Sequence, residues 1–208
     1  MINIVIPMAG LGSRFSQAGY ENPKPFIDVN GKPMIEKVLE NLSIPDARFI
    51  LLVRDEHIRD FSVYLESLNK NYEVVIFPIS TFTQGTACTV LLSRKLIDND
   101  AHMVIANSDQ IIDLKFSEFI SNAVKRDLDG SILTFEDKKR DPKWSFARLD
   151  KNNFVVEVQE KKPISTKATV GIYYFKKGSD FVEAAFDMML DQNTVNGEYY
   201  TCPVYNYL

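Results

Sequence analysis

The chain has few residues of the types that build metal clusters or disulfide frameworks. Its 208 residues include two cysteines and two histidines. Cys88 and Cys202 lie far apart, with no cysteine or histidine beside either, so they predict neither a zinc site nor a disulfide. We interpret both as buried thiols. His57 and His102 have no evident catalytic partner in the sequence, so neither is assigned a catalytic role.

Long apolar runs and blocks of like charge are also missing. No apolar run approaches the roughly 18 residues that indicate a membrane span. The apolar opening, residues 2–7, has no basic segment ahead of it, unlike a signal peptide, so we expect a cytoplasmic protein without a membrane partner. The net charge is −4, which does not favour binding to nucleic acid, and the charged residues before Trp144 are interpreted as a surface loop.

The residues that are present predict a single α/β domain over residues 1–208. Hydrophobic residues make up 45% of the chain, enough for one substantial core. Short apolar runs alternate with segments of helical period, which predicts a Rossmann-like three-layer sandwich with a mostly parallel, mixed sheet. Strands are expected at residues 2–7, 49–53, 74–77, 103–106, 132–135, 147–149, 154–158 and 170–175. Helices are expected at residues 33–42, 58–68, 85–97, 116–126 and 181–190.

Two further expectations concern the first loop and one helix. Residues 10–28 are rich in glycine, proline and charge, so they predict a long loop before the first helix. In the helix at residues 116–126, the helical period predicts that Phe116, Phe119, Ile120 and Val124 face inward.

The segment Gly10-Leu11-Gly12-Ser13-Arg14 follows the first strand and indicates a phosphate cradle. Glycines let backbone amides approach an anion, and Arg14 adds a permanent forked charge. A dinucleotide fingerprint would need glycine where Phe15 stands, and the Gly-Lys-Ser/Thr ending of a Walker loop is absent. Ten residues later, Pro23 and Pro25 restrict the backbone on both sides of Lys24, which fits a lysine that must meet a phosphate oxygen.

Taken together, these motifs resemble the sugar-phosphate nucleotidyltransferase superfamily. The resemblance spans nearly the whole chain, and its late part is most similar to a short branch from capsule and surface-polysaccharide gene clusters. That branch includes cytidylyltransferases for small phosphates such as phosphocholine and phosphoglutamine. The motifs that carry the resemblance are Gly10 to Arg14, Pro23-Lys24-Pro25, Gly31-Lys32-Pro33, Gln84-Gly85-Thr86-Ala87, Asn107-Ser108-Asp109-Gln110, Glu160-Lys161-Lys162-Pro163, Val170-Gly171-Ile172-Tyr173 and Glu198-Tyr199-Tyr200.

The resemblance implies a fold of the nucleotide-diphospho-sugar transferase type and a division of roles at the nucleotide. Gly10, Gly12, Ser13 and Arg14 would hold the phosphates of an NTP, and Lys24 would neutralise charge at the transferring α-phosphate. Arg14, Lys24 and Asp109 are therefore the expected catalytic residues. An acceptor phosphate is already ionised at neutral pH, so it can act as the nucleophile without a general base.

The remaining nucleotide contacts are expected around the base. Gln84, Gly85 and Thr86 open a helix after a strand and loop, where an amide side chain and backbone could read the base edge. Ala9 and Gly10 would supply further backbone contacts. The favoured nucleotide is CTP, and sugar 1-phosphate transfer from dTTP, UTP or GTP is the alternative.

The resemblance places the acceptor near residues 160–171. Glu160 and Gly171 are expected acceptor-binding residues, and one lysine should grip the acceptor phosphate. The family pattern is Glu-Lys-Pro, whereas this chain has two lysines, so Lys161 and Lys162 both remain candidates. Strand alternation would place Glu160 and Lys162 on one face, with Lys161 on the other.

Magnesium is the implied cofactor. Asp109 follows the strand at residues 103–106, and carboxyl ends of such strands are where open α/β sheets bind ligands. Mg²⁺ prefers one or two carboxylates with phosphate oxygens and water. Glu198 is the expected second ligand, with Asp113 behind it. A glycosyltransferase would usually carry Asp-x-Asp, and the chain instead has Asp109-Gln110-Ile111.

The last residues leave several points open. The tyrosines between Tyr199 and Tyr207 are interpreted as packing rather than as an acceptor pocket. Residues 204–208 resemble the beginning of a helix that continues in relatives, which leaves open that the chain is truncated.

The expected partners are an NTP and a small phosphorylated acceptor, and the resemblance allows a homodimer. A non-catalytic nucleotide-sensing domain is the alternative of another class.

Overall fold

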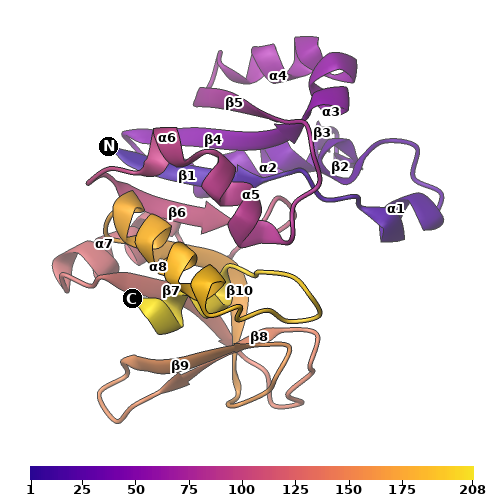
Figure 1. The fold of residues 1–208 in the computed structure, drawn as a ribbon. Coiled ribbons are helices and arrows are strands. Elements are labelled where there is room, and N and C mark those ends of the chain that lie inside the picture. Colours follow the sequence, from indigo (N-terminus) through magenta and orange to yellow (C-terminus); the bar gives the residue numbers. More distant parts are fainter.

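The protein forms an eight-stranded mixed sheet with helices on both faces (Figure 1). The structure is a computed structural model that describes residues 1–208. The strands in sequence order are β1 (Ile2–Pro7), β4 (Ala47–Arg54), β5 (Glu73–Ile79), β6 (His102–Ala106), β7 (Gly130–Glu136), β8 (Ser145–Leu149), β9 (Val155–Glu160) and β10 (Lys167–Phe175). Their spatial order is β5-β4-β1-β6-β10-β8-β9, with β7 also paired to β10. A two-stranded sheet joins β2 (Asp28–Val29) and β3 (Lys32–Pro33).

The first half of the sheet is parallel and the second half is antiparallel. β1 runs parallel to β4 and β6, and β4 runs parallel to β5. β10 is antiparallel to β6, β7 and β8, and β8 is antiparallel to β9. Because β7 and β8 are each antiparallel to β10, they point the same way as β6, and only β9 and β10 run against the other strands. The predicted α/β class with a mostly parallel, mixed sheet is therefore confirmed.

Helices cover each face of this sheet over its own hydrophobic cluster. The first face is covered by α2 (Met34–Leu42), α4 (Ser62–Leu68) and α7 (Phe116–Lys125). The second face is covered by α5 (Thr86–Leu92), α6 (Arg94–Ile97), α8 (Gly178–Leu190) and the 3₁₀ helix η2 (Cys202–Tyr207). None of the helices combines the length and the apolar character needed to cross a membrane.

Strand β1 shows why the parallel strands appear in the sequence as continuous apolar runs. Ile4 and Ile6 pack into the cluster on the first face, while Val5 packs into the cluster on the second face. All three side chains are fully buried. Because helices cover both faces, nearly every position along the strand is apolar, and alternation disappears from the sequence. The exception is Asn3, which is fully buried and whose Oδ1 accepts a hydrogen bond from Nε of Arg48 at 2.9 Å.

Two predicted helices are each interrupted. The helix expected at residues 58–68 is split into α3 (Asp55–Asp60) and α4 at Phe61, whose φ of −120° leaves the helical region. The helix expected at residues 85–97 is split into α5 and α6 at Ser93. The buried Ser93 hydroxyl donates to the carbonyl of Val90 at 2.7 Å, a local bond that competes with helix continuation.

Three smaller expectations are wrong. The 10–28 loop contains the helix α1 (Ser13–Gln17) and the 3₁₀ turn η1 (Lys24–Phe26). On α7, Val124 is 45% exposed and Ala123 faces the core instead, since the buried positions 116, 119 and 123 fall on one stripe of the helix. Cys202 is buried as expected, but Cys88 is only half-buried on the outer side of α5.

Candidate active site

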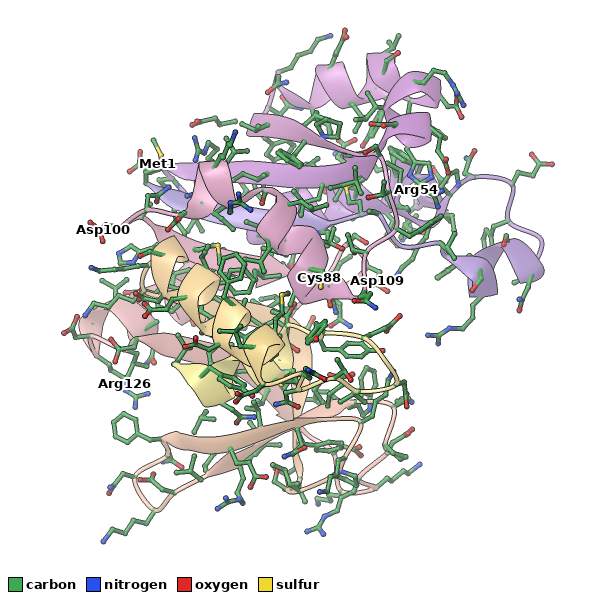
Figure 2. All side chains as sticks on the ribbon, in the orientation of Figure 1. Met1, Arg54, Cys88, Asp100, Asp109 and Arg126 are labelled. Atoms are coloured by element: carbon green, nitrogen blue, oxygen red, sulfur yellow. The ribbon has the colours of Figure 1, made fainter.

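The predicted nucleotide residues gather where the parallel strands end. β1 and β6 are parallel neighbours, so the loop after Pro7 and the loop after Ala106 leave the sheet at the same edge. Figure 2 shows Asp109 at this edge, together with Cys88 of α5, whereas Met1 and Asp100 lie at the opposite edge. This carboxyl edge is where open α/β sheets bind their ligands.

The loop after β1 presents free backbone donors. The N–H groups of residues 9–12 donate no hydrogen bond within the protein, and Gly12 adopts φ of +60° at the start of α1. A methyl group on Gly12 would lie 3.3 Å from Cβ of Lys24, so the glycine also allows close packing of the two loops. Ser13 and Arg14 are exposed, and Arg14 forms no salt bridge. The arrangement offers backbone amides and an exposed, unpaired guanidinium to an anion.

Lys24 is held in place by the residues that follow it. Pro25 and Phe26 are buried, and the ring of Phe26 stacks on Phe61 with a centroid distance of 4.0 Å and an interplanar angle of 3°. His57 and Tyr64 meet the same ring edge-on. The two prolines were predicted to restrict the backbone around Lys24. The packing of Phe26 against other aromatic rings restrains it further, and the sequence alone did not predict this packing.

Lys24 and Asp109 form an ion pair across the two loops. The ammonium nitrogen of Lys24 lies 2.5 Å from Oδ2 of Asp109, and both side chains remain partly exposed, at 26% and 31%. Asp109 follows Ser108, which is buried and anchors the loop after β6. Two residues separated by 85 positions in the sequence, and predicted to act at one α-phosphate, are therefore in direct contact.

The environment of Asp109 fits a magnesium ion. Its carboxylate is accessible at a strand end, and only Oδ2 contacts Lys24, so an oxygen remains for a cation. No group of three or more His, Cys, Asp or Glu side chains is positioned to enclose a metal. One carboxylate completed by phosphate oxygens and water is the donor set that Mg²⁺ commonly accepts. The electrostatic contacts of Glu198 are with Glu160, Lys161 and Tyr200 on the acceptor side.

The Gln84-Gly85-Thr86 turn lies against the backbone of Tyr199. The Tyr199 N–H donates to the Gln84 carbonyl at 2.8 Å, and the Ala87 N–H donates to the Tyr199 carbonyl at 3.0 Å. Gly85 has φ of +103°, and a methyl group there would collide with the Tyr199 backbone. Gln84 itself is exposed, so its amide group is free to contact a base.

Glu160 is a buried carboxyl group at the end of β9. It is 9% exposed and accepts a short hydrogen bond from the Ser145 hydroxyl. Burial raises the pKa of Glu160, and the nearby Glu198 carboxylate adds to this, while Ser145 and Lys161 oppose it. The carboxyl group is thus shielded from water and held by Ser145.

Lys161 and Lys162 differ sharply in environment. β9 ends at Glu160, and Lys161 adopts φ of +55°, so the alternation expected across these residues is wrong. The Lys161 ammonium donates to the Tyr200 hydroxyl at 2.6 Å and lies 4.5 Å from the centre of the Tyr200 ring. Hydrogen bonding to Tyr200 raises the pKa of Lys161. Lys162 is exposed to solvent.

Gly171 brings β10 close to the loop that carries Asp109. Its φ is +87°, at a register shift between Thr169 and Tyr173, and the Asn107 side chain occupies the space where a side chain would be. The Asn107 N–H donates to the Gly171 carbonyl at 3.1 Å. Glycine at this position therefore permits close contact between β10 and the loop after β6.

An apolar pocket lies beside Asp109. It has a volume of about 380 Å³, and Ile111, Leu114 and Val170 contribute to its walls together with Phe135 and Trp144. The Trp144 carbonyl accepts a hydrogen bond from the Lys161 N–H at 3.1 Å, which connects the pocket to the acceptor lysine. Trp144 and Tyr200 were interpreted as surface or packing residues, because nothing in the linear sequence places them beside Lys161.

The fold and this edge define a nucleotide-binding α/β protein in which free amides, a fixed lysine and a strand-end carboxylate converge. The model of the nucleotidyl transferase family matches residues 4–195 of the chain. The chain therefore belongs to the nucleotidyl transferase family.

Curated relatives are similar over most of this chain. A bifunctional protein GlmU from Methanococcus aeolicus is 26% identical over 177 residues, which cover 84% of this chain and 40% of the relative. The catalytic subunit beta of mannose-1-phosphate guanylyltransferase from Dictyostelium discoideum is 24% identical and is covered to 48%. The chain thus spans less than half the length of these curated relatives.

Solved structures share the fold over almost the whole chain. A nucleoside-diphosphate-sugar pyrophosphorylase from Vibrio cholerae is 26% identical with a TM-score of 0.78, covering 98% of this chain and 86% of that one. A UDP-glucose pyrophosphorylase complexed with UDP-glucose has a TM-score of 0.80 at 16% identity, covering 99% and 86%. The second likeness supports the fold alone, which is the nucleotide-diphospho-sugar transferase type.

Proposed function

We propose that the chain is a Mg²⁺-dependent nucleotidyltransferase that couples an NTP, with CTP favoured, to a small phosphorylated acceptor and releases pyrophosphate. The product would be a precursor for capsule or surface polysaccharide. The observation that carries the proposal is the Lys24–Asp109 pair at the edge where the free amides of residues 9–12 also point. Family membership supports the reaction class.

In this proposal, the protein positions two phosphates and stabilises charge. An oxygen of the acceptor phosphate attacks the α-phosphorus of the NTP, and the bond from that phosphorus to the β-bridging oxygen breaks, so pyrophosphate leaves with its electron pair. Gly10, Gly12, Ser13 and Arg14 hold the phosphates of the NTP, while Lys24 meets the charge that develops at the α-phosphate. In-line displacement of this kind needs positioning and electrostatics rather than covalent catalysis.

In this proposal, substrate binding draws the Lys24 ammonium from Asp109 toward the α-phosphate. The anionic α-phosphate competes for the Lys24 ammonium, which frees the Asp109 carboxylate for the cation that accompanies the nucleotide. Asp109, with Glu198 as the proposed second ligand, would hold Mg²⁺, which would supply charge neutralisation on the phosphate oxygens.

The acceptor side supports a small phosphorylated compound. One N–H of the Lys161 ammonium is donated to the Tyr200 hydroxyl, and two N–H groups remain for an acceptor phosphate. Lys161 is therefore a stronger candidate than Lys162 for binding that phosphate. The adjoining pocket is mostly apolar, with Trp144 and Phe135 packed edge-to-face at 5.4 Å and Asp113 at its margin. Aromatic rings with a carboxylate suit a quaternary ammonium such as that of phosphocholine.

Sugar 1-phosphate transfer from dTTP, UTP or GTP is the second candidate function. It is favoured by the relatives, whose printed names include mannose-1-phosphate guanylyltransferase and nucleoside-diphosphate-sugar pyrophosphorylase. The fold is the same for both candidates, so the discriminating features are the base turn at Gln84 and the pocket at Trp144.

A pyrophosphate-release screen tests the proposal and separates its alternatives. CTP, UTP, dTTP and GTP are crossed with phosphocholine, phosphoglutamine, glucose 1-phosphate and mannose 1-phosphate, with and without Mg²⁺. The proposal expects the fastest release with CTP and a non-sugar phosphate. Release only with a sugar 1-phosphate assigns the second function, and nucleotide binding without turnover of any pair identifies a nucleotide-sensing domain.

A further inference from the structure

Residues 198–200 lie between the two halves of the proposed site. On the nucleotide side, the backbone of Tyr199 forms two hydrogen bonds with the turn that contains Gly85, at 2.8 and 3.0 Å. On the acceptor side, the Tyr200 hydroxyl accepts a hydrogen bond from the Lys161 ammonium at 2.6 Å. Neighbouring residues of one segment thus contact the base turn and the acceptor lysine.

The contact on the nucleotide side is tight. At Gly85, the backbone has positive φ, and a methyl group would overlap with the Tyr199 N, C and O atoms. The turn therefore cannot shift relative to Tyr199 without breaking both hydrogen bonds. A nucleotide that orders the base turn will also order Tyr199.

The contact on the acceptor side fixes the direction of one long side chain. Lysine loses considerable rotamer freedom when it is ordered, so a fixed ammonium costs free energy before any ligand binds. The Tyr200 hydroxyl and ring together hold this ammonium. The remaining two N–H donors stay available, so Tyr200 orients Lys161 without blocking it.

The segment is anchored at both ends, which restricts independent movement of Tyr199 and Tyr200. Before it, Asn196 and Gly197 have positive φ between the paired residues Val195 and Glu198, the geometry of a tight two-residue hairpin turn. After it, Thr201 to Val204 are buried against α8 and β9. Displacement of either tyrosine is therefore transmitted to the other.

We propose that Tyr199 and Tyr200 couple the two substrate sites, so that a bound nucleotide stabilises the Lys161–Tyr200 contact and raises the affinity for the acceptor phosphate. The inference rests on the proposed function, and it adds positive cooperativity between substrates. Tyr200 is a positioning residue that acts through Lys161. By linkage, the acceptor must raise nucleotide affinity by the same factor, which we expect to be about fivefold or more.

The test measures this coupling by calorimetry with unreactive nucleotides. The probes are α,β-methylene-CTP with phosphocholine, and α,β-methylene-UTP with glucose 1-phosphate as a second pair. In the wild-type protein, each partner should tighten binding of the other by the same factor. In Tyr200→Phe, the ring remains but the hydroxyl is lost, so acceptor affinity should fall several-fold, nucleotide affinity alone should stay unchanged, and the coupling factor should approach one.

Tyr207→Phe is the matched control. Tyr207 also accepts one hydrogen bond through its hydroxyl, from Asn193 at 3.2 Å, but it contacts neither half of the site. This variant should keep the wild-type coupling factor. A loss of coupling in both variants, or equal weakening of both affinities in Tyr200→Phe, would indicate general loosening and overturn the inference.

A second measurement needs no variant. The Ala87 amide donates to Tyr199, so acceptor alone should slow hydrogen exchange in the peptide that contains Ala87. Protection confined to residues near Lys161, or a wild-type coupling factor of one with both probes bound, overturns the coupling while leaving the proposed function intact. Absence of nucleotide binding and of pyrophosphate release overturns both.

Discussion

The Lys24 ammonium and the Asp109 carboxylate lie 2.5 Å apart, although one belongs to the loop after β1 and the other to the loop after β6. Each neutralises the other while no phosphate is present. In the proposed reaction, both groups turn to the nucleotide, Lys24 to the α-phosphate and Asp109 to the accompanying cation. This relationship leads to separate predictions for the two residues.

Lys24→Met should lower kcat by about 10²–10³-fold, because a single preorganised donor to transition-state charge typically contributes that much. The free energy of unfolding should change little, since the ion pair is partly exposed and screened. Steady-state kinetics and urea denaturation check the two parts. Lys70→Met, at an exposed lysine without an ion pair, should be neutral in both. A wild-type kcat in Lys24→Met would remove the lysine from the mechanism.

Asp109→Asn should weaken Mg²⁺-dependent nucleotide binding, because an amide is a poor ligand for a hard cation compared with a carboxylate. Mn²⁺ titration followed by electron paramagnetic resonance in the presence of nucleotide measures this without turnover. Glu198→Gln should cause a smaller loss, and Asp113→Asn should cause less still. Unchanged Mn²⁺ binding in Asp109→Asn would contradict the assignment.

Gly85→Ala should destabilise the protein by about 2 kcal/mol or more, because alanine at positive φ is strained and its methyl group meets the Tyr199 backbone. Chemical denaturation gives the free energy of unfolding. Gly10→Ala is the stability control, since nothing lies within 4 Å of an added methyl group there. Equal stability of the two variants would show that Tyr199 does not press on this turn.

Glu160 should make the protein less stable as the pH rises. Burial raises its pKa in the folded state, so the folded protein binds the proton more tightly than the unfolded chain does. Its unfavourable contribution begins near the ordinary glutamate pKa and is complete above the raised pKa. Glu160→Gln should therefore stabilise the protein at pH 7 but not at pH 3.5, while it impairs use of the acceptor.

Thermal denaturation at several pH values measures the difference between Glu160→Gln and the wild type. Glu157→Gln provides a control of opposite sign, because hydrogen bonding to Arg148 lowers the pKa of Glu157. That carboxylate contributes stability at neutral pH, which is lost as the pH falls through its lowered pKa. A destabilised Glu160→Gln at pH 7 would contradict the account of the buried carboxyl group.

The sequence predicted the strands of this fold well because β1, β4 and β6 are buried on both faces, which leaves unbroken apolar runs such as residues 2–7. It predicted the helix breaks poorly. Phe61 fits the apolar period of a continuous helix, whereas in the structure it lies at the break and stacks on Phe26, a tertiary contact that periodicity does not reveal.

The nucleotide half of the candidate site was easier to predict than the acceptor half. Residues 10–14 and Lys24 are marked by glycine and proline, whose backbone preferences act locally. The roles of Tyr200 and Trp144 depend on hydrogen bonds to Lys161 from segments 39 and 17 residues away. Their sequence neighbourhood carries no local signal of that contact.

The central claim is transfer of the α-phosphoryl group with its nucleoside, and the fate of an isotope label tests it most directly. The protein is incubated with Mg²⁺, phosphocholine or glucose 1-phosphate, and CTP or UTP labelled with ³²P at either the α- or the γ-position. The account predicts that the α-label enters the acceptor product and the γ-label appears in pyrophosphate. A γ-label in the acceptor product, or no labelled product from any pair, would contradict it.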